Sequence, residues 1–163
     1  FDAQTNNYFL GFKLARGAYM EKERERAKEM GYNSPIYPNK KATDKGYDDA
    51  VRFCVEHIDR IAICAGTHNE TSSEMLVKLM EEKNIAKNDP RIYFSQLLGM
   101  SDHISFNLSH AGYNVVKYVP YGPVKNVLPY LIRRAQENTS VKGQTGRELS
   151  LILTEMKRRG MKK

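Results

Sequence analysis

Tryptophan is absent from this 163-residue sequence, cysteine occurs only twice, and no apolar run is long enough to cross a membrane. Cys54 and Cys64 have a spacing typical of neither a metal site nor a redox pair, which favours a reducing compartment. The signatures GxGxxG and GxxxxGK[ST] are also missing, so no glycine-rich phosphate loop is predicted. No segment resembles a signal peptide and Phe1 is not methionine, so we expect the chain to begin inside a larger protein.

The excess of basic residues is modest. Lysine and arginine number 26 against 19 acidic residues, which gives a net charge of +7 and a pI near 9.4, and several of the basic residues crowd the C-terminal tail. A basic tail can contact nucleic acid or an anionic membrane. Because no nucleic-acid motif accompanies it, we predict no nucleic-acid partner and leave peripheral membrane contact open. The length and a 40% hydrophobic content predict one domain over residues 1–163.

Apolar runs alternate with amphipathic segments along the chain. Strands are expected within 9–19, 61–65, 91–98 and 115–119. Helices are expected over 20–31, from Thr43-Asp44, from a Thr71/Glu74 capping box, over 102–110 capped by Ser101, from Pro123, and over about 145–159. This order predicts an α/β fold with a parallel sheet.

Polar side chains follow each expected strand at its carboxyl end. They are Arg16 and Tyr19, then Thr67, His68 and Asn69, then Gln96, and finally Tyr118. In parallel α/β folds this edge of the sheet carries the ligand site. Each position also has an ordinary explanation, since Asn69 could cap a helix, Gln96 could satisfy backbone groups and His68 could be packed. Four such ends on one edge predict a polar cofactor or substrate.

The last strand leads into a helix with two distinct faces. Val124, Val127, Leu128, Leu131 and Ala135 form an apolar stripe. Tyr130, Arg133, Arg134 and Glu137 share another face. Paired guanidiniums suit a small carboxylate or a phosphate, because the planar fork binds either through parallel hydrogen bonds. The alternative is a solvated face of Arg–Glu pairs.

Two other groupings have catalytic or metal-binding residue types. Ser101, Asp102 and His103 are the types of a catalytic triad, but a triad is assembled in space, and contiguous residues at a helix start are better explained as a cap and first turn. His68 with Cys64 or His103 does not make a credible set of metal ligands, so no metal site is predicted.

Five motifs, in order, resemble proline dehydrogenase, in the branch that includes the mitochondrial enzymes and their bacterial relatives. They are Lys13-Leu14-Ala15-Arg16-Gly17-Ala18-Tyr19, Thr67-His68-Asn69, Gln96-Leu97-Leu98-Gly99-Met100, Tyr118-Val119-Pro120-Tyr121-Gly122-Pro123 and Tyr130-Leu131-x-Arg133-Arg134-x-x-Glu137-Asn138. The likeness covers residues 8–140, and a terminal helix with a basic tail occupies 141–163.

The resemblance implies a distorted (β/α)8 barrel of the TIM type that holds FAD without a covalent bond. It implies oxidation of L-proline to Δ1-pyrroline-5-carboxylate by hydride transfer to FAD, the first step of proline catabolism, with electrons passed to a membrane quinone. The expected location is the bacterial cytoplasm or inner-membrane face, or the matrix side in mitochondria.

The resemblance also implies roles for individual residues. Arg133 and Arg134 would clamp the substrate carboxylate, Glu137 would orient them, and Tyr118, Tyr130 and Leu98 would wall the ring. Lys13 would place a cation beside the reactive flavin nitrogen, so Lys13, Arg133 and Arg134 are the expected catalytic residues. The residues expected around the flavin are Lys13, Ala15, Arg16, Gly17, Tyr19, Thr67, His68, Asn69 and Gln96.

The chain departs from the family in extent. A complete barrel needs roughly 250 residues, and this sequence matches only the C-terminal half, strands 5–8. The family's first four strands, with a catalytic aspartate and a substrate-side lysine, have no counterpart. We therefore expect a chain or segment carrying the N-terminal half to be required for activity. The alternatives are an inactive barrel fragment, a ligand-binding module without turnover, or a phosphate-binding α/β protein of another class.

Overall fold

The computed structural model describes residues 2–17, 19–140 and 144–160. The chain divides into two compact units, Phe1–Tyr118 and Val119–Lys163, and each is described by itself. A single domain over 1–163 therefore stays a prediction.

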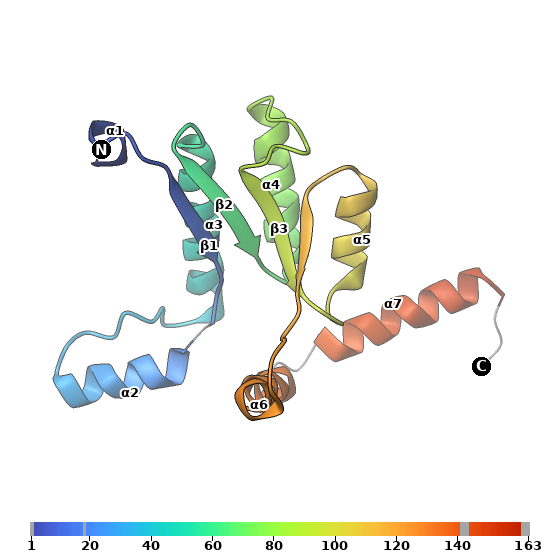
Figure 1. The fold of residues 1–163 in the computed structure, drawn as a ribbon. Coiled ribbons are helices and arrows are strands. Elements are labelled where there is room, and N and C mark those ends of the chain that lie inside the picture. Colours follow the sequence, from blue (N-terminus) through green and yellow to red (C-terminus); the bar gives the residue numbers. More distant parts are fainter. Residues whose placement is uncertain (1, 18, 141–143, 161–163) are drawn as a thin grey trace. The chain divides into compact units, whose positions relative to one another are not determined.

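The first unit is built on a parallel sheet (Figure 1). Its strands are β1 (Leu10–Leu14), β2 (Ile61–Gly66), β3 (Ile92–Leu97) and β4 (Val115–Tyr118), and they lie in the order β1-β2-β3-β4. Each strand pairs in parallel with the next one along the chain. The predicted α/β fold with a parallel sheet is thus confirmed. Strand β1 is shorter than the expected segment 9–19, because the chain leaves the sheet after Leu14.

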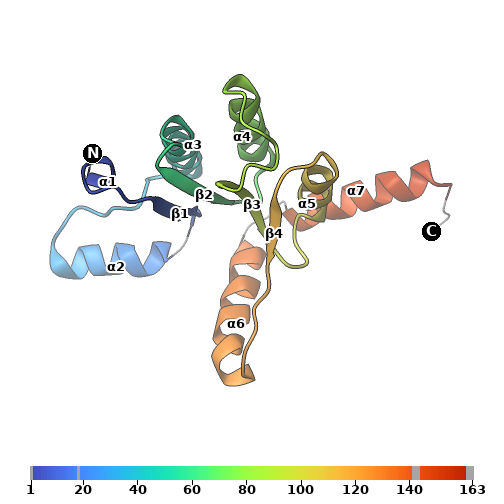
Figure 2. The ribbon, with the colours of Figure 1, turned by 45° about the horizontal axis from the view of Figure 1, so that its top comes forward.

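Helices cover one face of this sheet. The unit contains α1 (Asp2–Thr5), α2 (Met20–Met30), α3 (Lys40–Glu56), α4 (Glu70–Glu82) and α5 (Asp102–His110). Helices α3, α4 and α5 lie on the same side of the strands in both views (Figures 1 and 2). The core between the two layers is apolar, as expected from the hydrophobic stripes of the helices. Its most deeply buried side chains include Val51, Val55, Ile63, Leu76, Met80, Ile92 and Phe94.

Two helices begin earlier than the sequence predicts. Helix α3 starts at Lys40 rather than at Thr43-Asp44, because the Asn39 side chain accepts a hydrogen bond from the backbone N–H of Ala42. Helix α4 starts at Glu70, and its cap is Asn69, which accepts from the Ser72 N–H. The predicted Thr71 capping box is therefore wrong, and Thr71 lies within the helix.

The other face of the sheet is uncovered by the described residues of the first unit. Its side chains follow from the register, which puts Lys13 beside Cys64, Cys64 beside Tyr93, and Leu97 beside Tyr118. Gly66, Ser95 and Val116 lie on the same face. This face therefore mixes small, polar and aromatic side chains, unlike the apolar face that packs against the helices.

The second unit consists of α6 (Val124–Ser140) and α7 (Gln144–Arg158). Helix α6 begins one residue after Pro123, whose carbonyl accepts the N–H groups of Asn126 and Val127. Pro129 lies inside α6, where it has no N–H to donate to the preceding turn. Among the described residues, no helix is both long enough and apolar enough to span a membrane.

Candidate functional site

Lys13 and Tyr118 meet on the uncovered face of the sheet, although they come from its two outer strands. The Lys13 ammonium lies 4.8 Å from the centre of the Tyr118 ring, in the geometry of a cation–π contact. Both side chains are exposed, Tyr118 to 42%. Gly66 of β2 lies next to Lys13, so no side chain from that position crowds the ammonium. The structure thus brings together a predicted flavin-side cation and a predicted substrate-side aromatic ring.

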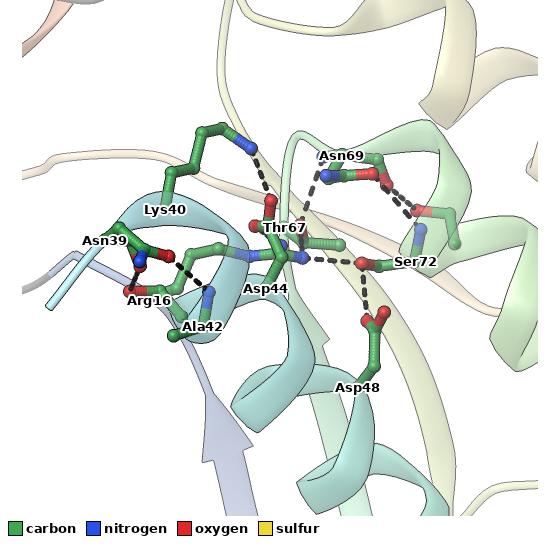
Figure 3. Close-up of polar contacts among 11 residues, drawn as sticks. Arg16, Asn39, Lys40, Ala42, Asp44, Asp48, Thr67, Asn69 and Ser72 are labelled. Atoms are coloured by element: carbon green, nitrogen blue, oxygen red, sulfur yellow. Dashed lines mark hydrogen bonds and ion pairs between the residues drawn. The ribbon is translucent and has the colours of Figure 1, made fainter. Parts of the chain in front are cut away.

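Arg16 lies at the carboxyl end of β1 and joins three other elements (Figure 3). Its guanidinium forms an ion pair with Asp44 of α3 and donates to the Thr67 hydroxyl at 2.9 Å and the Ser72 hydroxyl at 2.7 Å. Its flat face lies 4.1 Å from the centre of the Tyr47 ring. Its Nε is buried and has no hydrogen-bond partner among the described residues. Arg16 therefore fixes the end of β1 to α3, α4 and the end of β2.

Two carboxylates on α3 support this cluster, and both lie on one face because they are four residues apart. Asp48 accepts a hydrogen bond from the Ser72 hydroxyl at 2.7 Å, while Asp44 accepts from Arg16 and Lys40. Burial raises the pKa of Asp44, but the hydrogen bonds and positive charges of Lys40 and Arg16 together lower it by more. The pKa of Asp44 therefore lies below its ordinary value. Asp44 is therefore held as a carboxylate at neutral pH.

The residues at the end of β2 take up distinct positions. Thr67 accepts both from Arg16 and from the Asn69 N–H, at 3.0 Å. Asn69 caps α4, which is the ordinary alternative for this residue. His68 Nδ1 lies 2.9 Å from the Ser101 hydroxyl oxygen. These bonds fix the backbone of the segment, whereas their predicted role around a flavin stays a prediction.

Gln96 points toward the helices rather than to the uncovered face. It is 2% exposed, its amide nitrogen donates to the Thr67 carbonyl at 3.2 Å, and its amide oxygen accepts from the Ser105 hydroxyl at 2.9 Å. This geometry matches the alternative in which Gln96 satisfies neighbouring polar groups. Its assignment to the flavin stays a prediction.

Ser101, Asp102 and His103 each have a different partner. Ser101 occupies the N-cap position of α5, but its φ is 51° and its side chain makes no capping hydrogen bond, so the predicted cap is wrong. Its hydroxyl lies against His68, while Asp102 pairs with Lys117 at 2.7 Å and His103 with Glu70 at 2.7 Å. The three residues therefore form no triad. Among the described residues, no group of three His, Cys, Asp or Glu side chains could hold a metal ion.

The segment after β1 is open and turns sharply. Ala15 and Gly17 are exposed, and Gly17 has a φ of 77°, a conformation that glycine adopts without strain. Tyr19 precedes α2 with a φ of 55° and is 65% exposed. Ala18, which belongs to the same motif, lies outside the described residues. The segment thus leaves backbone groups accessible at the same edge as Arg16.

Leu98 lies in the turn that follows β3, where it is 58% exposed. Its backbone N–H donates to the Tyr118 carbonyl at 3.0 Å, so the two predicted ring-wall residues are directly linked through the backbone. This link places both residues at the carboxyl end of the sheet.

The predicted clamp lies on α6, in the second unit. Arg134 and Tyr130 share one face of this helix, and the guanidinium carbon lies 5.2 Å from the ring centre. Arg133 and Glu137 lie on the same helix, but their side chains are outside the described residues. The spacing of the four residues therefore agrees with one shared face, while the clamp itself stays a prediction.

Sequence reasoning missed the residues that support the site from behind. Asp44 and Asp48 lie in the polar first half of α3, where charged residues are common. No feature of the sequence around them indicates that they belong to the Arg16 cluster. Lys117 did carry a signal, because it interrupts the apolar run 115–119. In the structure its ammonium binds the turn that follows β3. A charged residue inside an apolar strand segment is a mark of such a tertiary contact.

Comparison with known sequences gives one consistent result. A family described as proline dehydrogenase matches residues 2–147. The chain is 46% identical over 160 residues to "Proline dehydrogenase 1, mitochondrial" of Homo sapiens, covering 96% of this chain and 27% of the relative. It is 43% identical over 170 residues to the protein of the same name in Drosophila melanogaster (98% and 25%). It is 45% identical over 161 residues to "Hydroxyproline dehydrogenase" of Xenopus laevis (96% and 34%).

Solved structures agree with the sequence comparison. Proline utilization A from Bdellovibrio bacteriovorus, inactivated by N-propargylglycine, superimposes with a TM-score of 0.77 at 30% identity, over 86% of this chain and 14% of that protein. A mutant of proline utilization A from Bradyrhizobium japonicum gives 0.72 at 26% identity, over 87% and 14%. The fold is therefore that of part of a (β/α)8 barrel. The chain spans about a quarter of the length of the mitochondrial relatives from Drosophila and human. With its motifs, its parallel half-barrel sheet and these matches, the chain belongs to the proline dehydrogenase family.

Proposed function

We propose that this chain is the flavin-side and substrate-clamping half of a proline dehydrogenase. Support comes from the family membership together with one observation, the contact of Lys13 with Tyr118 on the uncovered face at the carboxyl end of the sheet. The reaction is the oxidation of L-proline to Δ1-pyrroline-5-carboxylate. A quinone accepts the electrons, and the expected compartment is the mitochondrial matrix side or the bacterial cytoplasm and inner-membrane face.

The residues present fit FAD as the cofactor. Gly66 and Cys64 are small and lie next to the exposed Lys13, which leaves room beside a cation for a planar ring that becomes negatively charged. Arg16, Thr67, His68, Asn69, Gln96 and the segment Ala15, Gly17 and Tyr19 would hold or border the cofactor. When bound, FAD would accept the hydride from proline.

The protein's own residues would position the substrate and stabilise charge. Arg133 and Arg134 hold the proline carboxylate by parallel hydrogen bonds, and Glu137 orients the pair. Tyr118, Tyr130 and Leu98 surround the ring. Lys13 stabilises the negative charge that would develop on the flavin as it is reduced. A cation that is already in place does this without reorganising during the reaction.

The proposal is tested first by spectroscopy. The protein, together with any segment that carries the other half of the barrel, should show flavin absorbance bands, and these should bleach when L-proline is added without oxygen. Flavin bands without bleaching would favour the ligand-binding alternative that lacks turnover. Absence of flavin after reconstitution with FAD would contradict the proposal.

The clamp is tested by Arg133→Lys. An ammonium cannot reproduce the planar fork, so proline should bind at least about tenfold more weakly while the flavin content stays the same. Exposed Arg24 on α2, replaced by lysine in the same way, is the matched control. Normal proline affinity in Arg133→Lys would show that the carboxylate is held elsewhere.

A further inference from the structure

Lys117 is a charged residue in a strand whose neighbours are apolar, and it points to the side that the helices cover. Its register partner is Gln96, which also faces the helices, whereas the adjacent Tyr118 lies on the opposite face. The Lys117 side chain is only 21% exposed. Withdrawing an ammonium from water is unfavourable unless its donors are satisfied, so a specific set of acceptors is expected.

The acceptors all belong to one turn. The Lys117 ammonium lies 2.8 Å from the Met100 carbonyl oxygen, 2.7 Å from Asp102 Oδ1 and 3.5 Å from the Leu97 carbonyl oxygen. An ammonium has three donors, and here each has an acceptor between residues 97 and 102. One side chain of β4 therefore binds the connection between β3 and α5 at several points.

This turn needs such support because one of its residues is strained. Gly99 has a φ of 77°, which glycine adopts without strain, but Ser101 has a φ of 51° and carries a side chain. A side-chain-bearing residue in that region persists only when its surroundings hold it there. The second support is His68, whose Nδ1 lies 2.9 Å from the Ser101 hydroxyl oxygen. The turn is thus held from β4 on one side and from the end of β2 on the other.

The same turn presents Leu98. Its side chain is 58% exposed, and its backbone N–H donates to the carbonyl of Tyr118, the residue after Lys117. The positions of Leu98 and Tyr118 relative to each other therefore depend on the backbone that Lys117 fixes. Lys117 itself lies on the far face of the sheet and does not reach the uncovered face.

We propose that Lys117 is a positioning residue for substrate binding, which acts through the 97–102 turn and sets where Leu98 stands beside Tyr118. This role rests on the proposed function, in which Leu98 and Tyr118 wall the substrate ring. Because Lys117 contacts neither substrate nor cofactor, its loss changes how well the ring fits. The KM for proline rises, while the flavin content is retained and kcat changes less than KM.

The test uses Lys117→Met, which keeps most of the length of the side chain and removes the ammonium, in the flavin-loaded assembly with the segment that carries the other half of the barrel. Amide hydrogen exchange at Leu98 and Met100 measures how often the turn opens. In the variant this exchange should be faster by about tenfold or more. Proline binding, followed through the flavin absorbance, should weaken by about tenfold, as for the loss of a charged hydrogen-bond network. Lys117→Arg, which keeps the charge, should restore much of both.

Two variants serve as matched comparisons. Lys78 lies on the exposed side of α4, and Lys78→Met should leave exchange and proline affinity unchanged. Asp102→Asn removes one of the three acceptors and should give a smaller effect in the same direction. If Lys117→Met does not fold, the same exchange and binding measurements on Asp102→Asn test the proposal.

The outcomes separate this role from the proposed function. Unchanged exchange at Leu98 and Met100, or faster exchange with an unchanged KM, would overturn the positioning role. Equal loss of proline affinity and of flavin would also overturn it, because that pattern indicates general loosening. Failure of the unsubstituted assembly to bind proline would instead overturn the proposed function, and the exchange measurement would still show how far Lys117 stabilises the turn.

Discussion

Arg16 is the residue on which the carboxyl end of β1 depends, and Asp44 is its charged partner. Removing the charge with Asp44→Asn should destabilise the fold by roughly 1–3 kcal/mol, because it leaves a partly buried guanidinium without its counter-ion. The flavin should also be held less tightly, since the ends of β1 and β2 are joined through this cluster. Thermal unfolding and flavin retention measure the two effects.

Asp49→Asn is the matched control for this prediction. Asp49 lies on the same helix and pairs with Lys45, but it is 55% exposed, so its loss should change stability very little. If both variants behave alike, the Arg16 cluster has no special role in holding the strand ends.

The same carboxylate gives a pH dependence with a defined sign. The pKa of Asp44 lies below its ordinary value in the folded protein, despite the upward effect of burial, because Lys40 and Arg16 donate to it. A group of this kind stabilises the fold above its unfolded pKa, and the stabilisation is lost as the pH falls through the folded pKa. Acid unfolding below about pH 4 should therefore be less steep in Asp44→Asn than in the unsubstituted protein.

At the scale of the helices, the start of α3 is set by one side chain. Asn39→Ala removes the acceptor for the Ala42 N–H and should cost about 1 kcal/mol, whereas Asn39→Asp should keep the cap. For a chain of this size the expected fall in Tm is about 2–4 °C. An equal fall in Asn39→Asp would point to a lost packing contact instead of a lost cap.

The elements themselves were largely readable from the sequence. Apolar runs such as Ile61–Ala65 predicted the strands because buried parallel strands are apolar where they face the helices. The starts of α3 and α4 were not, because Asn39 and Thr43, or Asn69 and Thr71, are all acceptable caps and lie only a few residues apart. Only the packed structure selects one of each pair.

The contacts behind the candidate site were less predictable still. Arg16, Asp44 and Ser72 are far apart in the sequence, and so are Lys117 and Met100. No local sequence pattern predicts which of the many charged residues will form tertiary ion pairs or hydrogen bonds. These contacts depend on the sheet register and on where each turn ends. The strand-end positions were predicted from the parallel order alone, whereas the direction of Gln96, toward the helices, depended on the register.

At the scale of the whole molecule, the first unit leaves surfaces that a complete barrel would cover. Among the described residues, β1 and β4 each pair with a strand on one side only, and the uncovered face carries Tyr93, Val116 and Tyr118, each at least 37% exposed. Unpaired strand edges and exposed apolar surface both favour association. The 163-residue chain by itself should therefore associate, and should not oxidise proline.

This prediction is measured by size-exclusion chromatography with light scattering, together with a proline:dye oxidoreductase assay. Adding a segment that carries the first four strands of a family barrel should shift the chain into a defined complex and produce activity. A monomer of the 163-residue chain that is stable, flavin-loaded and active would contradict the half-barrel interpretation.

The strand register also bears on how the first unit forms in time. Phe94 pairs with Val115 and Ile63 with Ile92, across a short helical connection in each case, whereas Leu10 pairs with Ile61 across α2, a long loop and α3. Closing a longer loop loses more chain entropy before any contact compensates for it. We therefore expect β2, β3 and β4 to assemble with α4 and α5 as a folding nucleus, and β1 to dock last. In pulse-labelling hydrogen exchange during refolding, the amides of β1 should gain protection after those of β3.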